Sequence, residues 1–121
     1  MNSRAKGKRI ELELCPHLGR VLGPCRRTAQ VDGGLSADIV FEDPRIRLHV
    51  EAKGRKRIAA LGFLRQAESD AKPGMVPVVV MRENGDTEPV LMLRLSELPG
   101  LCQQYANARG TPVYPEIKDG T

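Results

Sequence analysis

The chain has 121 residues and a mass of 13.3 kDa, with 40% hydrophobic and 28% charged residues. This composition predicts one folded domain over residues 1–121 and excludes a wholly disordered chain. No apolar run approaches the roughly 18–20 residues that cross a bilayer, and residues 1–9 lack the apolar core of a secretory signal. We therefore expect a cytoplasmic protein with no membrane partner.

Basic residues outnumber acidic ones, 19 to 15, which gives a net charge of +4 and a pI of about 9.2. This balance favours a polyanionic partner. The chain has no Trp, two Phe and two Tyr, which argues against a platform that stacks on single-stranded bases. The three cysteines include no CxxC pair, so we expect reduced thiols and no zinc finger.

The N-terminal half begins with a basic arm, predicted over residues 1–8. Residues 8–22 fit two patterns, because residues 9–14 alternate as a strand does while Ile10, Leu14 and Leu18 fall on one helical stripe. The Glu and Leu content favours the helix, with a kink at Pro16. A short strand is predicted over 26–31, followed by a turn at 32–34.

Residues 37–42 and 46–53 both alternate between polar and apolar side chains, as strands with one buried face do. Asp43-Pro44-Arg45 between them suits a type I turn, with Pro at its second position. The two runs therefore predict a β-hairpin.

The C-terminal half predicts a helix over 57–72, a strand over 76–81 that is buried on both faces, a turn at Asn84-Gly85 and a strand over 89–95. Ser96 is expected to cap a last helix over 97–108, before an irregular tail over about 109–121. The order α-β-β-β-α-β-β-α indicates an α/β domain with a central mixed sheet flanked by helices.

Asp38, Glu51 and Lys53 are the residues of this hairpin with the clearest chemistry. If the turn is centred on Pro44 and Arg45, Asp38 lies directly opposite Glu51, with Cβ atoms about 4.5–5.5 Å apart. Two carboxylates so close repel each other unless a cation lies between them, and oxygen ligands suit Mg²⁺ or Mn²⁺. The backbone carbonyl of Ala52 is a further ligand within reach. The alternative is a solvated sheet face of cross-strand ion pairs.

Lys53 leaves the same face as Glu51, because side chains two apart on a strand share a face. An ammonium beside a carboxylate-bound metal can orient a water or stabilise the charge that develops on a phosphate. The predicted chemistry is phosphodiester hydrolysis.

Two stretches, 34–40 (GLSADIV) and 49–54 (HVEAKG), resemble the motif of the PD-(D/E)xK nucleases, with Ala37 where that motif often has Pro. Residues 6–11 (KGKRIE) resemble the start of archaeal-type Holliday junction resolvases and small phage-encoded resolvase-like nucleases. Residues 66–80 are similar to their second helix and core strand. The resemblance implies a restriction-endonuclease-like αβββαβ core, Glu11 as a further catalytic acid, and a Mg²⁺-dependent endonuclease acting on four-way junctions as a homodimer. It also implies a bacterial or phage-infected cell as the setting.

Basic residues surround these motifs and are predicted to bind DNA phosphates: Arg4, Lys6, Lys8, Arg9, Arg26, Arg27, Arg55, Lys56 and Arg57. Gln66 is an accessory candidate, since a helical Gln contributes to the site in some nucleases that the chain resembles. Two other functions stay open: a nuclease of this kind with another DNA substrate, for nicking or repair, and a catalytically silent nucleic-acid-binding domain.

Overall fold

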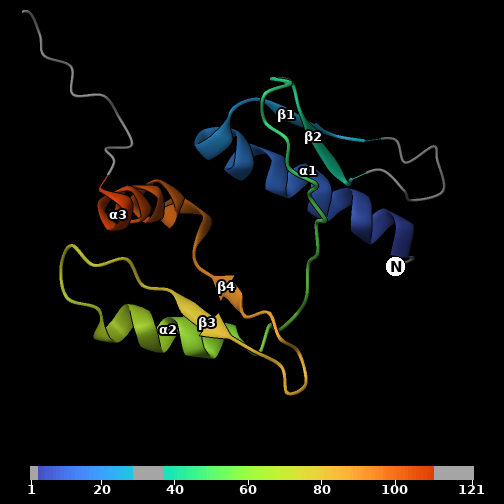
Figure 1. Ribbon diagram of the computed structural model, residues 1–121. Coiled ribbons are helices and arrows are strands. Elements are labelled where there is room, and N and C mark those ends of the chain that lie inside the picture. The colour runs from blue at the N-terminus through green and yellow to red at the C-terminus, as the bar shows by residue number, and fades with distance from the viewer. Residues whose placement is uncertain (1–2, 29–36, 111–121) are drawn as a thin grey trace, which may run out of the picture. The chain divides into compact units, whose positions relative to one another are not determined.

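The computed structural model describes residues 3–28 and 37–110 of the chain, and the side chains from residue 5 on. Its backbone contacts divide it into two compact units, residues 1–57 and residues 58–121. Each unit has its own helix or helices and its own pair of short strands (Figure 1).

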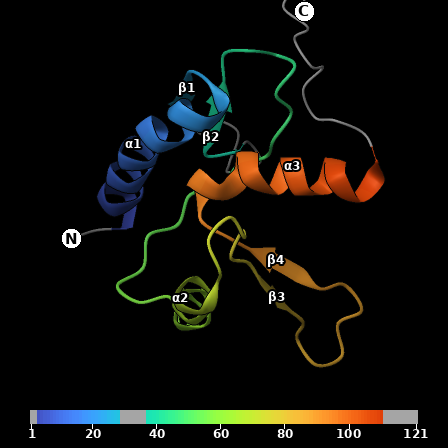
Figure 2. The ribbon, with the colours of Figure 1, turned by 90° about the vertical axis from the view of Figure 1, so that its left-hand side faces the viewer.

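The first unit contains helix α1 (Ser3–Leu22), strand β1 (Cys25–Arg27) and strand β2 (Ile39–Phe41), with α1 lying along the strands (Figures 1 and 2). The helical prediction for residues 8–22 is confirmed and the strand pattern there is wrong. The helix already begins at Ser3, so the expected arm over residues 1–8 is helical from that residue on. Pro16 lies inside the helix without ending it.

Strands β1 and β2 are antiparallel, with Arg27 paired to Ile39, and Ile39 is fully buried. The predicted turn is confirmed, because the Ile46 amide donates to the Asp43 carbonyl at 3.1 Å. The second arm of the hairpin is not a strand, contrary to prediction, and it meets β2 at a single bridge between Ile39 and Val50. Leu48 is 51% exposed, so the apolar side of this arm is only partly covered and gains little from pairing along its length.

The second unit contains helix α2 (Leu61–Asp70), strands β3 (Val79–Met81) and β4 (Val90–Met92), a 3₁₀ turn (Leu95–Glu97) and helix α3 (Leu98–Arg109). Helix α2 packs beside β3, which pairs antiparallel with β4 (Figure 1). Its buried residue, Leu64, is 1% exposed.

Two expectations for this unit are wrong. Val80 is 66% exposed, so β3 is not buried on both faces. Ser96 does not cap the last helix, because the 3₁₀ turn includes it and α3 begins two residues later. A side-chain pair joins α2 to the chain after β4, with Arg94 Nε 2.9 Å from Glu68 Oε2.

These elements make the protein a mixed α/β structure, as predicted. The single mixed sheet is not present in the described part of the chain, which contains two antiparallel pairs, β1–β2 and β3–β4. The reason in the first unit is local: residues 46–53 do not extend the β1–β2 pair beyond one bridge. No helix of the described residues is long and apolar enough to span a membrane.

Candidate functional site

Three polar residues are buried among the described residues, and all lie in the first unit: Glu11 (7% of the residue exposed), Thr28 (8%) and Asp38 (6%). Glu11 lies in α1, Thr28 directly follows β1 and Asp38 directly precedes β2. Buried carboxylates are unusual because they lose the hydration of a charge, so each needs compensating contacts. Two of them in a unit this small mark the region as a candidate site.

Asp38 is held from both sides by the segment that carries Glu51. Its amide donates to the Val50 carbonyl at 2.7 Å, and its Oδ2 accepts the Ala52 amide at 2.7 Å. The Ile39–Val50 bridge has the register that the turn predicts, so Asp38 lies next to Glu51. The register that the turn predicts is therefore confirmed.

Glu51 differs from Asp38 in its exposure. Its side chain is 52% exposed, and its Oε1 lies 2.8 Å from Nε2 of His49, two residues earlier on the same side of the extended chain. Lys53, two residues later, is also exposed. The described residues include no cluster of three or more His, Cys, Asp or Glu side chains able to hold a metal. A metal at Asp38, Glu51 and the Ala52 carbonyl therefore stays a prediction.

Glu11 lies on α1 and meets Arg27 of β1, whose Nε donates to Glu11 Oε2 at 2.9 Å. Arg27 was predicted only as a phosphate ligand. Arg27 pairs with Ile39, the residue that directly follows Asp38, so the ion pair lies close to Asp38. The structure therefore brings Glu11, Arg27 and Asp38 into one region, and no pattern in the sequence indicates the Glu11–Arg27 contact.

Thr28 is a site residue that sequence reasoning missed. Its hydroxyl donates to the Ala37 carbonyl at 2.8 Å, and its amide donates to the Asp38 carbonyl at 3.0 Å. These bonds fix the backbone just before Asp38 and so orient its side chain. A threonine after two arginines has no pattern that would have indicated this role.

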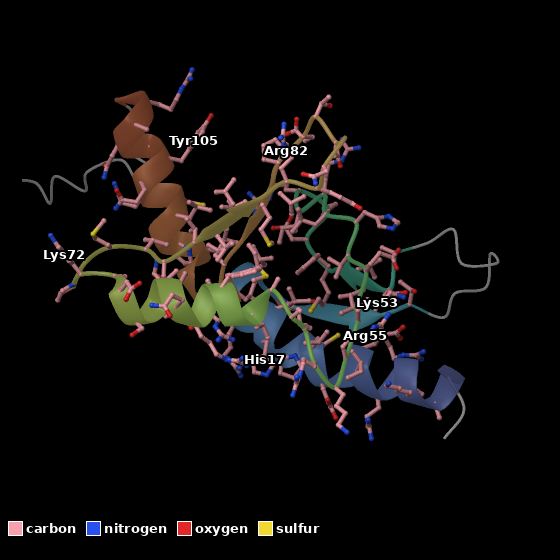
Figure 3. The ribbon with its side chains drawn as sticks, turned by 90° about the horizontal axis from the view of Figure 1, so that it is seen from below. His17, Lys53, Arg55, Lys72, Arg82 and Tyr105 are labelled. Atoms are coloured by element: carbon pink, nitrogen blue, oxygen red, sulfur yellow. The ribbon has the colours of Figure 1, made fainter. Side chains whose placement is uncertain are left out.

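Four of the residues predicted to bind DNA phosphates and the predicted catalytic lysine form what we call the basic groove: Lys6, Arg9, Arg55 and Lys56, with Lys53. It lies between the N-terminal half of α1 and the segment after Ala52. Figure 3 shows Lys53 and Arg55 beside the ribbon of α1.

The other predicted residues lie elsewhere. Lys8 lines a different hollow, with Leu12 and Glu13. Arg26 and Arg57 are exposed, and the Arg4 side chain is outside the described residues. Gln66 belongs to the second unit, where its amide donates to Asp70 Oδ2 at 2.9 Å.

Comparison of the chain with protein-family models, with curated proteins and with solved structures finds no match.

Proposed function

We propose that the protein is a metal-dependent DNA endonuclease that hydrolyses phosphodiester bonds, with Asp38, Glu51 and Lys53 at its centre. The observation that supports this proposal best is the placement of Asp38 between the Val50 carbonyl and the Ala52 amide, next to Glu51. A solvated face of ion pairs would leave Asp38 exposed, whereas it is 6% exposed.

The donor set suits Mg²⁺. This ion is usually held by one or two carboxylates and keeps several waters, so Asp38, Glu51 and the Ala52 carbonyl are sufficient. The exposed side of Glu51 leaves access for water and for a phosphate. Bound there, Mg²⁺ supplies Lewis-acid polarisation of a phosphoryl oxygen and lowers the pKa of a coordinated water.

Lys53 and the Glu11–Arg27 pair have the other roles in the proposed site. Lys53 lines the basic groove, where its ammonium can hold a phosphate oxygen and orient the attacking water. Glu11, paired with Arg27, positions that arginine beside the start of β2 and is the further acid of the proposed site.

The substrate and assembly follow from the resemblance to resolvases. We propose four-way DNA junctions as the substrate, and recombination as the process. Symmetric cutting of a junction needs two active sites, which a two-fold homodimer provides. The restriction-endonuclease-like core belongs to the same proposal.

The test is a cleavage assay with labelled four-way junction and matched linear duplex, in Mg²⁺ and in EDTA. We compare the wild type with Lys53→Ala, Asp38→Asn and the control Lys72→Ala, an exposed lysine of the second unit. Asn keeps an acceptor for the Ala52 amide, so Asp38→Asn tests the charge and not the fold. We expect paired cuts near the crossover with wild type and control, and a loss of about 10²–10³-fold in both site variants.

Each other outcome revises the proposal in a defined way. Equal cutting of the junction and the linear duplex would support nuclease activity but contradict a preference for four-way junctions. Full activity of Lys53→Ala removes the role given to Lys53. Junction binding with no cutting in any metal favours the catalytically silent nucleic-acid-binding domain.

A further inference from the structure

Two adjoining hollows on the first unit make up the basic groove, with volumes of about 280 and 300 Å³. Lys6, Ile10, Gly54 and Arg55 line both of them, so the hollows form one continuous depression. One end of it is at Lys53 and the other reaches Arg9 and Lys56. Its walls come from one face of α1 and from the chain that follows Ala52.

The backbone of Gly54 lies against the side chain of Ile10 in this depression. A Cβ placed on Gly54 would collide with the side chain of Ile10, whose Cγ1 would be 2.6 Å away. Any larger residue at position 54 would therefore force Ile10 or the segment after Lys53 to shift. The apolar side chain of Ile10 forms part of the floor, and the cations stand around it.

The charge of the groove is of one sign. Among the described residues, no acidic and no aromatic side chain lines either hollow. Arg9 of the groove forms an ion pair with Glu13, and this pair neutralises little of the charge. Arg9 Nε is 3.8 Å from Glu13 Oε1, and both side chains are more than half exposed. Like charges repel, so a groove lined by five cations is electrostatically complementary to an anionic ligand, which would offset their repulsion.

We propose that the basic groove binds the phosphate backbone of duplex DNA, independently of sequence and without a metal. Repeated phosphates match a row of cations, and duplex DNA carries one charge per roughly 1.7 Å of its axis. The absence of an aromatic lining among the described residues favours backbone contact over stacking on single-stranded bases. The inference rests on the proposed function in one respect: Lys53 would contact both the groove-bound strand and the phosphate that is cut.

The test measures binding of a fluorescent duplex of about 20 base pairs by anisotropy, in EDTA, at 50–200 mM salt. The variants are Lys6→Gln, Lys56→Gln and the pair combined, with Lys72→Gln and Arg82→Gln as matched controls from the second unit (Figure 3). Lys6 lies in the first turns of α1, where a cation opposes the helix dipole, so its neutralisation does not weaken the helix.

We expect the double variant to bind about tenfold more weakly and to lower the slope of log K against log salt by about 0.9 per lost contact. The controls should stay within about twofold of the wild type. Wild-type affinity in the double variant would contradict duplex binding by the basic groove. An equal loss of affinity in the two control variants would contradict it as well. Tighter binding of single-stranded DNA, or of a heparin fragment of equal charge, would overturn the duplex assignment.

The assay separates this inference from the proposed nuclease, because EDTA removes cleavage from the measurement. Suppose that Lys53→Ala abolishes cutting while the Lys6→Gln/Lys56→Gln variant keeps wild-type affinity for the duplex. This result would contradict DNA binding by the basic groove and would leave the proposed nuclease intact. If duplex binding depends on the groove lysines but the protein cuts no DNA, the result would support duplex binding by the basic groove and contradict only the proposed nuclease activity.

Discussion

The Glu11 side chain is 9% exposed and its partner Arg27 is 33% exposed, so the pair lies at the edge of the interior. Arg27→Met should lower the free energy of unfolding by about 1–3 kcal/mol, because it leaves a buried carboxylate without its charge-assisted hydrogen bond. Urea unfolding followed by circular dichroism measures the change.

Arg26→Met is the matched control, because its side chain is exposed on the same strand. We expect it to change stability by less than about 0.5 kcal/mol. Glu11→Gln combined with Arg27→Met should cost less than the sum of the two single changes, because the pair acts as a unit. Equal losses for the two arginine variants would contradict a specific Glu11–Arg27 pair.

Cys25 differs from Cys102 in its surroundings. Its Sγ donates to the Cys15 carbonyl at 3.3 Å, and burial, followed by the nearby Cys15 thiol, raises the pKa of the Cys25 thiol. A raised pKa means less thiolate at neutral pH, and the thiolate is the species that reacts. Iodoacetamide at pH 7.5 should therefore label exposed Cys102 well before Cys25, as read by mass spectrometry.

The difference in labelling should narrow as the pH rises toward the pKa of Cys25. Equal labelling rates of Cys25 and Cys102 at pH 7.5 in the folded protein would contradict the environment described for Cys25. The same comparison in urea supplies the control, since unfolding removes the burial.

The packing of α1 against the segment after Lys53 depends on Gly54. Gly54→Ala should lower the free energy of unfolding by about 1–3 kcal/mol, because the new methyl group overlaps Ile10. It should also weaken duplex binding, since the wall of the basic groove moves away. Chemical unfolding and anisotropy measure the two effects.

Gly19→Ala is the control within the same helix, because no atom lies within 4 Å of the added Cβ. It should raise stability by roughly 0.5–1 kcal/mol through helix propensity. Ile10→Ala combined with Gly54→Ala should recover part of the loss, since the smaller side chain removes the overlap. A harmless Gly54→Ala would contradict the close approach.

The ion pair between Glu68 of α2 and Arg94, which follows β4, should make a pH-dependent contribution to stability. The Arg94 guanidinium lowers the pKa of the Glu68 carboxyl below its ordinary value. The carboxylate therefore contributes stability above its unfolded pKa of about 4.3, and this contribution is lost as the pH falls through the lower folded value. Glu68→Gln should reduce the loss of stability below about pH 4.5, as measured by thermal unfolding at a series of acid pH values. A pH profile of stability equal to that of the wild type would contradict a stabilising Arg94–Glu68 ion pair.

The sequence predicts local features better than contacts between elements. The apolar stripe of α1 is readable, and Pro16 is tolerated because its face of the helix is exposed and water can satisfy the freed carbonyl. The turn at Pro44 set the register that places Asp38 beside Glu51. The Glu11–Arg27 pair and the Gly54–Ile10 contact were not predictable, because they join distant elements through tertiary packing that no local pattern encodes.

Charge is distributed unevenly over the whole molecule. Residues 1–57 contain thirteen Lys and Arg against seven Asp and Glu, whereas residues 58–121 contain six against eight. The net charge of +4 thus comes from the first unit, which also holds the basic groove. A polyanion at moderate salt should therefore engage the first unit, where the positive potential is concentrated.

Lysine acetylation with and without duplex DNA tests this distribution in the intact protein. In EDTA at low salt, bound duplex should lower the labelling of Lys6, Lys53 and Lys56 several-fold and leave that of Lys72 unchanged, because phosphates cover amines only where they bind. Quantitative mass spectrometry reads each site, and raising the salt should restore labelling as counterions displace the DNA. Protection of Lys72 equal to that of Lys56 would show that binding follows overall charge and that the first unit has no special role.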